Sequence, residues 1–188
     1  MNEYFIHPTS IVDENVDIGD NTKIWHFSHI QSGARIGKNC SFGQNVNVSN
    51  NVIIGDGVKV QNNVSIYEGV ELEDYVFCGP SCVFTNDLTP RAKYPKGNAG
   101  YKKTVVEEGA SIGANATIVC GHRIGRYALI GAGAVVTSNV PAHALMIGIP
   151  ARIVGWVCEC GELLSDKLVC SKCDRKYIKI CDGLEEMR

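Results

Sequence analysis

Residues 36–60 read IGKNCSFGQNVNVSNNVIIGDGVKV, and in this stretch an apolar residue stands at every sixth position. These positions are Ile36, Phe42, Val48, Ile54 and Val60. A six-residue period is neither the 3.6-residue repeat of a helix nor the two-residue alternation of a strand. It is typical of a solenoid whose chain runs straight for a few residues, turns and repeats, so that three hexads make one triangular coil.

The period extends far beyond this stretch in both directions. It runs from Ile6 to Phe84 and resumes from Val106 to Val136. Four residues after most of these positions stands a small or β-branched residue, and we expect both columns to point into a narrow interior. The gap between Phe84 and Val106 is 22 positions, which is one hexad plus 16 inserted residues. The pattern predicts an all-β solenoid with one extruded loop.

A third column, three residues after the apolar one, prefers asparagine or glycine. These two residue types tolerate the positive φ that a tight corner requires. We therefore expect a corner of the solenoid at each such position. The positions are Asn15, Asn21, Gly33, Asn39, Asn45, Asn51, Gly57, Asn63, Gly69, Gly109, Asn115, Gly121, Gly133 and Asn139.

Composition and charge narrow the class of protein. The 188 residues carry a formal charge of -2, which gives no electrostatic reason to expect nucleic acid or a membrane surface as a partner. No apolar stretch approaches the ~18 residues of a spanning helix, and the N-terminal sequence MNEYFIHPTS lacks the pattern of a signal peptide. The nine cysteines are then better read as thiols or metal ligands than as disulfides. We expect a soluble, cytoplasmic protein without membrane insertion.

Several hexads resemble those of a known family. IGDNTK (18–23), IGKNCS (36–41), IGDGVK (54–59), IGANAT (112–117) and IGRYALIGAGAVVTSNVPAHALMIGIPAR (124–152) resemble the hexapeptide-repeat acyltransferases. The resemblance covers about residues 6–156. It implies a left-handed parallel β-helix and a homotrimer with active sites between neighbouring subunits. The closing GIPAR is typical of members that use acyl-CoA.

A β-helix also occurs without chemistry. Ice-binding helices would show repeated Thr-x-Thr ranks, which this sequence lacks, and the carbonic anhydrase branch of the fold needs three histidines gathered at a subunit interface. The five histidines do not have suitable spacing: His7, His26, His29, His122 and His143. These absences favour catalysis of another kind. The alternative from a different class is a non-catalytic trimeric scaffold whose tail binds a partner.

The interruption at about residues 85–105 reads FTNDLTPRAKYPKGNAGYKKT from Phe84 to Thr104, and it is basic and aromatic. Solenoids extrude insertions as loops without disturbing the core, and such loops tend to carry function. Arg91 and Tyr101, with the lysines around them, suit a phosphate-bearing substrate or coenzyme. A solvated surface loop is the other interpretation.

The sequence around the loop resembles one branch of the family. IWHFSHI (24–30), FGQNVNV (42–48) and VQNNVSIYEGVELEDYVFCGPSCVFTN (60–86) are similar to N-acetyltransferases of nucleotide-linked 3-amino sugars. The similarity is greatest to the branch that acetylates UDP-2-acetamido-3-amino-2,3-dideoxyglucuronate for surface polysaccharides. Enzymes acting on dTDP-3-amino-deoxyhexoses share much of the pattern. The nucleotide and the C6 group of the sugar therefore stay open.

The hexad columns bring candidate substrate-binding residues to one corner. His26, Gln44 and Asn62 occupy the same position in successive coils, and Gln61 stands beside Asn62. Amide groups there can read base edges and sugar hydroxyls. The remaining substrate candidates are Lys59, suited to a phosphate or carboxylate, Tyr67 on the next side, and Arg91 and Tyr101 in the loop.

The reaction implied is attack of a neutral amine on the thioester of acetyl-CoA, in which positioning supplies much of the rate. The resemblance assigns the Asn of the FTN motif, Asn86, to hold the amine. Its amide oxygen can accept a hydrogen bond from the substrate N–H, but it cannot take a proton at neutral pH. His122 as a general base is the rival. For coenzyme A we expect residues of the later coils: Arg126, Gly131, Ala132, Ile147 and Arg152.

After Trp156 the period ends and VCECGELLSDKLVCSKCDRKY (157–177) begins. Cys158 and Cys160 form one close pair and Cys170 and Cys173 a second, a set that matches a tetrahedral zinc site. Four thiolates leave no open position, so we expect a structural metal. The domains predicted are therefore 1–156, a β-helix acetyltransferase domain, and 157–188, a small zinc-ribbon-like segment whose stability depends on the metal.

Overall fold

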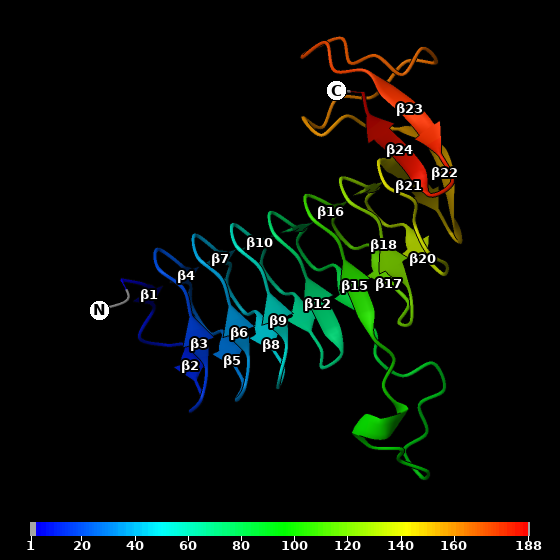
Figure 1. The fold of residues 1–188 in the computed structure, drawn as a ribbon. Helices are drawn as coiled ribbons and strands as arrows, with labels where there is room; N and C mark the ends of the chain where they lie inside the picture. Colours follow the sequence, from blue (N-terminus) through cyan, green and yellow to red (C-terminus); the bar gives the residue numbers. More distant parts are fainter. Residues whose placement is uncertain (1–2, 188) are drawn as a thin grey trace.

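The computed structural model describes residues 3–187, most of which form three sheets of mainly parallel strands around one axis. Each coil places one short strand in each sheet before the chain moves on, and the result is a left-handed parallel β-helix (Figure 1). The predicted all-β class and β-helix are confirmed. A separate two-stranded sheet, β23 (Tyr177–Ile180) and β24 (Gly183–Glu186), lies in the C-terminal tail.

The sheets collect every third strand of the chain. The nine-stranded sheet contains β1 (Phe5–Ile6), β4 (Lys23–Ile24), β7 (Ser41–Phe42), β10 (Lys59–Val60), β13 (Phe77–Cys78), β16 (Ser111–Ile112), β19 (Leu129–Ile130), β21 (Ala144–Gly148) and β22 (Ala151–Trp156). The seven-stranded sheet contains β2 (Ile11–Val12), β5 (His29–Ile30), β8 (Asn47–Val48), β11 (Ser65–Ile66), β14 (Val83–Phe84), β17 (Thr117–Ile118) and β20 (Val135–Val136). The six-stranded sheet contains β3 (Asp17–Ile18), β6 (Arg35–Ile36), β9 (Ile53–Ile54), β12 (Val70–Leu72), β15 (Thr104–Val106) and β18 (Arg123–Ile124).

Three corners join the sheets in every coil. The first corner leads from the nine-stranded to the seven-stranded sheet and is formed in the second coil by residues 25–28. The second corner (31–34) leads to the six-stranded sheet, and the third (37–40) returns to the nine-stranded sheet one coil further on. Neighbouring coils are about 4.8 Å apart along the axis, the spacing of hydrogen-bonded strands.

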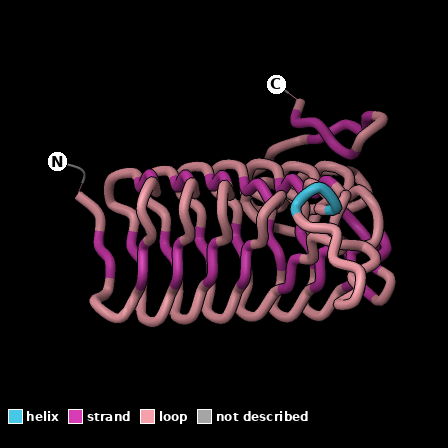
Figure 2. Tube along the Cα trace, turned by 90° about the horizontal axis from the view of Figure 1, so that it is seen from below, coloured by secondary structure: helices cyan, strands magenta, loops and turns pink. Residues whose placement is uncertain are grey.

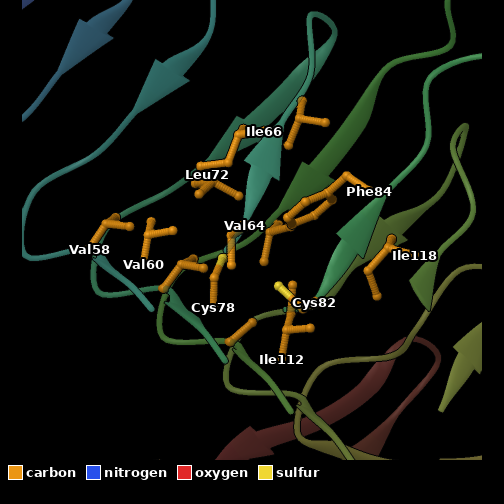
Figure 3. Close-up of a cluster of buried hydrophobic side chains, with 14 of the residues drawn as sticks. Val58, Val60, Val64, Ile66, Leu72, Cys78, Cys82, Phe84, Ile112 and Ile118 are labelled. Atoms are coloured by element: carbon orange, nitrogen blue, oxygen red, sulfur yellow. The ribbon is translucent and has the colours of Figure 1, made fainter. Parts of the chain in front are cut away.

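The apolar column of the sequence fills the interior. Ile24, Phe42, Val60 and Phe84 are at most 1% exposed, and they belong to one continuous cluster that runs the length of the coils. Figure 3 shows Val60, Ile66, Leu72, Cys78 and Phe84 converging with the small residues Val64 and Cys82. Strand partners in successive coils repeat the same inward positions, so each apolar side chain packs on its counterpart one coil away.

The corners use the left-handed backbone conformation that the sequence predicted. Most of the asparagines and glycines named above have positive φ, from 55° at Asn115 to 93° at Gly69, whereas Asn139 is not among them. Five further corners put a larger or polar residue there: Phe27, Tyr75, Ser81, Tyr127 and His143. Two of these aromatic rings cover a glycine one coil earlier. A Cβ on Gly57 would lie 2.6 Å from the Tyr75 ring, and one on Gly109 would lie 2.3 Å from the Tyr127 ring.

The inserted loop extends outward from the second corner, between β14 and β15. Before it, strand partners such as Lys59↔Phe77 are separated by one coil of three hexads. Across it, partners such as Phe77↔Ser111 are separated by one coil plus the inserted segment, so the coils continue in register. Residues 88–99 of the insertion are all exposed, and it holds one 3-10 turn, Asn98–Gly100 (Figure 2). Because β15 begins at Thr104, the loop ends two residues before the predicted boundary.

The coils end in an antiparallel hairpin of β21 and β22, after which the tail turns back onto the third corner. Gly183 pairs with Ala142, and Arg123 is bonded to both Glu107 and Asp182. Within residues 3–187, no helix is long and apolar enough to cross a bilayer.

Candidate active site

The loop encloses a hollow around the predicted amine-binding residue. Asn86, Arg91 and Tyr101 line one cavity of about 380 Å³ together with Tyr94 and Lys96. The main-chain carbonyl of Asn86 accepts a hydrogen bond from the Lys102 N–H at 2.9 Å, which ties the two ends of the loop together. The structure thus gathers three of the predicted site residues at the base of the loop.

Asp87 was not predicted from the sequence, although it adjoins Asn86 and lines the same cavity. Its carboxylate pairs with the Lys96 ammonium and accepts the Thr89 N–H at 2.8 Å. Chiefly because of Lys96, the pKa of Asp87 lies below its ordinary value. Asp87 is therefore anionic at neutral pH. It can attract a substrate ammonium, but it is a weak base for removing a proton.

His122 lies at the second corner one coil beyond Asn86. The N–H of Cys120 donates to the Thr85 hydroxyl at 2.9 Å, which fixes this coil against the start of the loop. His122 is half-buried although its neighbours in the hexad column, Ala116 and Ala128, are fully buried. It does not line the loop cavity, whereas Asn86 does.

Four of the predicted substrate-binding residues share the first corner. His26, Gln44 and Asn62 stack in successive coils, with Gln61 beside Asn62. The Oδ1 of Asn62 accepts the main-chain N–H of Gln44 at 2.8 Å. Asn62 therefore has a structural role in its corner, and it can still offer a ligand its amide N–H groups and the second lone pair of Oδ1. Gln44 is exposed, and His26 and Gln61 are half-buried.

Lys59 and Tyr67 lie away from that column. Lys59 points outward on the nine-stranded sheet, between Ser41 and Phe77 in register. Tyr67 is 40% exposed and belongs to the second corner, one coil before Asn86. In a single chain the predicted substrate residues other than Lys59 thus divide between two corners, with the seven-stranded sheet between them.

Most of the residues predicted to bind coenzyme A lie at one end of the helix. Ile147 pairs with Arg152 in the closing hairpin, and a Cβ on Gly131 would lie 3.2 Å from Ile147. Ala132 follows Gly131 in the same corner. Arg126 does not join them. It lies at the third corner and lines a polar cavity of about 250 Å³ between the coils and the tail.

The four predicted metal ligands converge. The sulfur atoms of Cys158, Cys160, Cys170 and Cys173 all lie within 4.8 Å of one another. Each close pair occupies a turn framed by an antiparallel bridge: Val157↔Leu163 for the first and Val169↔Lys176 for the second. Hydrogen bonds, chiefly from the Arg175 main chain, lower the pKa of Cys173 to about 6. Four converging thiols, of which Cys173 favours the thiolate form, suit a tetrahedral zinc ion.

Tyr177 and His143 connect this cluster to the coils, and neither was predicted. The Tyr177 hydroxyl is hydrogen-bonded to the Cys158 sulfur at 3.1 Å and accepts the N–H of Glu159. Its ring packs against His143, which is 4% exposed and hydrogen-bonded through Nδ1 to the Val157 carbonyl. Burial is the main reason why the pKa of His143 is lowered. The periodic pattern carries no signal for contacts between the tail and a coil.

Comparisons with known proteins agree with this arrangement. Residues 15–50 match the family model for the bacterial transferase hexapeptide (six repeats). Residues 33–68 and 103–138 match the model for the hexapeptide repeat of succinyl-transferase. The matched segments flank the extruded loop on both sides.

Two solved structures have the same fold. A hexapeptide-repeat-containing acetyltransferase from Vibrio cholerae, complexed with acetyl coenzyme A, is 27% identical with a TM-score of 0.55, and the match covers 66% of this chain and 70% of that one. A mutant of GDP-perosamine N-acetyltransferase from Caulobacter crescentus is 23% identical with a TM-score of 0.56, covering 82% of this chain and 57% of that one. At this identity the second likeness concerns the fold alone.

A curated relative extends the similarity over nearly the whole chain. It is dTDP-3-amino-3,6-dideoxy-alpha-D-galactopyranose 3-N-acetyltransferase from Aneurinibacillus thermoaerophilus, 47% identical over 183 residues. The match covers 96% of this chain and 93% of the relative. On this identity and coverage, the chain belongs to the hexapeptide-repeat acetyltransferases.

Proposed function

We propose that the protein transfers the acetyl group of acetyl-CoA to the amino group of a nucleotide-linked 3-amino sugar. The observation that carries this proposal is the 47% identity to a dTDP-3-amino-sugar N-acetyltransferase over nearly the full length of both chains. That relative favours a dTDP-linked 3-amino-3,6-dideoxyhexose as the acceptor. The UDP-linked 3-amino glucuronate stays a second candidate. The exposed Lys59 ammonium belongs to none of the described ion pairs and suits either a phosphate or the carboxylate of that sugar.

In the proposed reaction the neutral amine attacks the thioester carbonyl, the C–S bond breaks, and an amide and free coenzyme A result. The Asn86 amide oxygen accepts a hydrogen bond from the amine and directs its lone pair at the carbonyl. Asp87 attracts the ammonium form, which gives one proton to bulk water before the neutral amine reacts. The departing thiolate takes the proton, so no side chain of the loop has to act as a base.

The division of the substrate residues between two corners supports a site shared by neighbouring subunits. We propose a homotrimer in which the first corner of one subunit faces the second corner and loop of the next. In such an assembly His26 and Gln44 of one chain and Asn86 of its neighbour contact one substrate. Coenzyme A would then reach the site from the closing hairpin, along Gly131, Ala132, Ile147 and Arg152.

We further propose that Cys158, Cys160, Cys170 and Cys173 hold a structural zinc ion. All four ligand positions are filled by the chain, so the ion supplies order to the tail and takes no part in acetyl transfer. Arg175 and Tyr177 are hydrogen-bonded to two of the sulfurs, as outer residues are at zinc sites. The free thiols elsewhere in the chain fit a reducing cytoplasm, which we propose as its location.

The test is thiol release from acetyl-CoA against a panel of dTDP- and UDP-linked 3-amino sugars. Fast release with a dTDP-3-amino-3,6-dideoxyhexose is expected. Release with only the UDP-3-amino glucuronate would keep the reaction and exchange the acceptor. No release from any member of the panel, by protein whose subunit assembly is intact, would refute the function.

The role of Asn86 is tested separately with Asn86→Ala. Loss of its positioning should lower kcat about 100-fold, while the thermal midpoint of unfolding stays close to that of the parent. Asn50→Ala is the matched control, because Asn50 holds the same position of the second corner two coils earlier. Wild-type turnover by Asn86→Ala would refute this role. Loss of turnover by His122→Ala alone would transfer the role to the histidine.

A further inference from the structure

A group of rings covers the first corner at the N-terminal end of the β-helix. The His7 and His26 rings stack with centroids 3.5 Å apart, and the Trp25 ring lies nearly parallel to His26 at 6.4 Å. Phe5 packs on Trp25 at 5.4 Å, and Phe27 lies beside His26 at 6.0 Å. We call these five residues the ring cluster. They come from two successive coils and form one aromatic surface.

The ring cluster is open to a ligand. Phe5, Trp25 and Phe27 are 42%, 40% and 59% exposed, so their faces are not used by the core of their own chain. In the next coil the position equivalent to Trp25 is Gly43, which has no side chain to cover the ring. A coil further on, the same position is Gln61, with the exposed Gln44 between them. A flat ring stacked on this surface would have amide groups along its edge.

Positive charge lies along the neighbouring sheet. Lys23 and Lys59 point outward on the nine-stranded sheet and are separated in register only by Ser41. They are therefore two coils apart, about 10 Å at the usual strand spacing. Neither forms one of the described ion pairs. Two ammonium groups outside those pairs, beside an aromatic surface, complement a ligand that joins a base to phosphates.

We propose that the ring cluster is the nucleobase subsite of the sugar-nucleotide substrate, with the base stacked on Trp25 and the diphosphate directed along Lys23 and Lys59. This inference rests on the proposed function. It adds Phe5, His7, Trp25, Phe27 and Lys23 to the binding surface. Aromatic side chains stack on any base, so stacking does not distinguish uracil from thymine. The amides of Gln44 and Gln61 therefore recognise the base through hydrogen bonds to its edge.

The spacing along the axis agrees with this assignment. The ring cluster lies in the first two coils, and Asn86 lies in the fifth coil, where the loop begins. Three coils separate Trp25 from Asn86, which is about 14 Å along the axis. An extended nucleoside diphosphate covers such a span between its base and its sugar. A substrate with its base on Trp25 can therefore present its amine to an Asn86 that belongs to the facing subunit.

The experiment is calorimetric titration of the full-length protein with UDP, with dTDP and with inorganic pyrophosphate, which has the charge but no base. Trp25→Ala should raise the Kd for both nucleotides about 5- to 100-fold, since stacking of a base on an aromatic side chain accounts for that range. Its Kd for pyrophosphate should not change. Trp25→Phe should restore most of the nucleotide affinity. Tyr75→Ala is the matched control, because Tyr75 is an exposed ring at the third corner.

Two results would overturn the subsite. One is equal nucleotide affinity in wild type and Trp25→Ala. The other is a change in the number of subunits in Trp25→Ala, which would make the ring cluster a contact between copies of the chain. The thiol-release assay with dTDP- and UDP-linked 3-amino sugars distinguishes refutation of the subsite from refutation of the proposed function. Turnover of a sugar nucleotide with a Kd that is insensitive to Trp25 removes only the subsite, whereas absence of both turnover and nucleotide binding removes both proposals.

Discussion

The coils and the C-terminal tail of this chain are ordered by different kinds of contact. In the coils one apolar cluster extends from Ile18 to Ala151, and each coil repeats the packing of its neighbour. Within residues 157–187, the separate cluster of buried side chains in the tail consists of Cys158, Cys170, Tyr177 and Leu184. Two of these four are candidate metal ligands. Repeated packing between neighbouring coils stabilises the β-helix, whereas the tail depends on one small cluster that includes two of the candidate metal ligands.

This difference predicts how each region responds to damage. A coil that loses one side chain keeps the contacts of the coils above and below it, so the loss is partial. A tetrahedral metal site that loses one ligand loses much of its affinity at once, and with it the folding energy of the segment. The following changes are ordered from the largest expected effect to the smallest.

The largest effect is expected from Cys170→Ser. Structural zinc contributes about 10 kcal/mol or more of apparent binding free energy in small zinc domains, so the tail should lose its zinc and its order together. Metal content by mass spectrometry and amide exchange over residues 157–187 measure the two losses. Cys181→Ser is the matched control, because Cys181 is exposed and outside the cluster. A Cys170→Ser tail that keeps its zinc and its protection would show that the tail does not need this site.

A core truncation in the coils should have a smaller effect. Phe84 is 1% exposed, and Phe84→Ala should cost about 3–5 kcal/mol through lost burial and the cavity left behind. The urea midpoint of the coils should fall while the zinc content of the tail stays unchanged. Val83→Ala on the outer face of the same strand should cost far less, since Val83 is 45% exposed. If Phe84→Ala also released zinc, the two regions would not be independent.

A corner substitution ranks third. Gly57 has a φ of 67°, and a Cβ there would also meet the Tyr75 ring, so Gly57→Ala should cost about 2 kcal/mol. Gly133→Ala at a corner near the C-terminal end of the coils shares the positive φ, 70°, but has open space around its Cβ. Both variants place a Cβ on a backbone with positive φ, but only Gly57→Ala also meets a ring. The difference between their thermal midpoints therefore measures the destabilisation that the clash with the ring causes. Equal midpoints would mean that the ring moves aside freely.

The smallest effect concerns the loop at low pH. The ammonium of Lys96 and the N–H of Thr89 hold the pKa of Asp87 below its ordinary value of 3.8. The stabilisation is therefore present above pH 3.8 and is lost as pH falls toward the lowered value. Pepsin cleavage within residues 85–103 should increase across that window without cleavage of the coils. In Asp87→Asn the increase should be absent, and a parallel increase in that variant would contradict the assignment.

The hexad pattern predicted the coils because each position in it has one physical requirement. An inward site must be apolar, and a corner must tolerate positive φ. The same pattern missed Phe27 and Tyr127 as corners, because a ring is accepted there for reasons set by the neighbouring coil, such as the bare surface of Gly109 beneath Tyr127. A glycine at the equivalent corner one coil before an aromatic residue is the signal that would have found Tyr75 and Tyr127.

The candidate site was predictable only in part. Asn86, Arg91 and Tyr101 meet because they belong to one loop, and the four cysteines meet because close pairs in a short segment have few other arrangements. Arg126 was expected near coenzyme A but lies beside the tail, since the tail folds back on the third corner. His143 and Tyr177 belong to a coil and to the tail respectively, and their contact follows from that docking alone. The six-residue period predicts where a residue lies on its coil, but it does not predict which residues of another segment, such as the tail, pack against it.

The register across the loop has a consequence for how such a protein can change. Strand partners on both sides of the insertion keep their faces, although the chain between them is longer there than in any uninterrupted coil. The strand register along the axis is therefore independent of how many residues the corner between β14 and β15 contains. Selection can alter the length and chemistry of the loop that holds Asn86 in one step, without repacking a single coil. New acceptor specificities can thus arise by loop exchange on an unchanged helix.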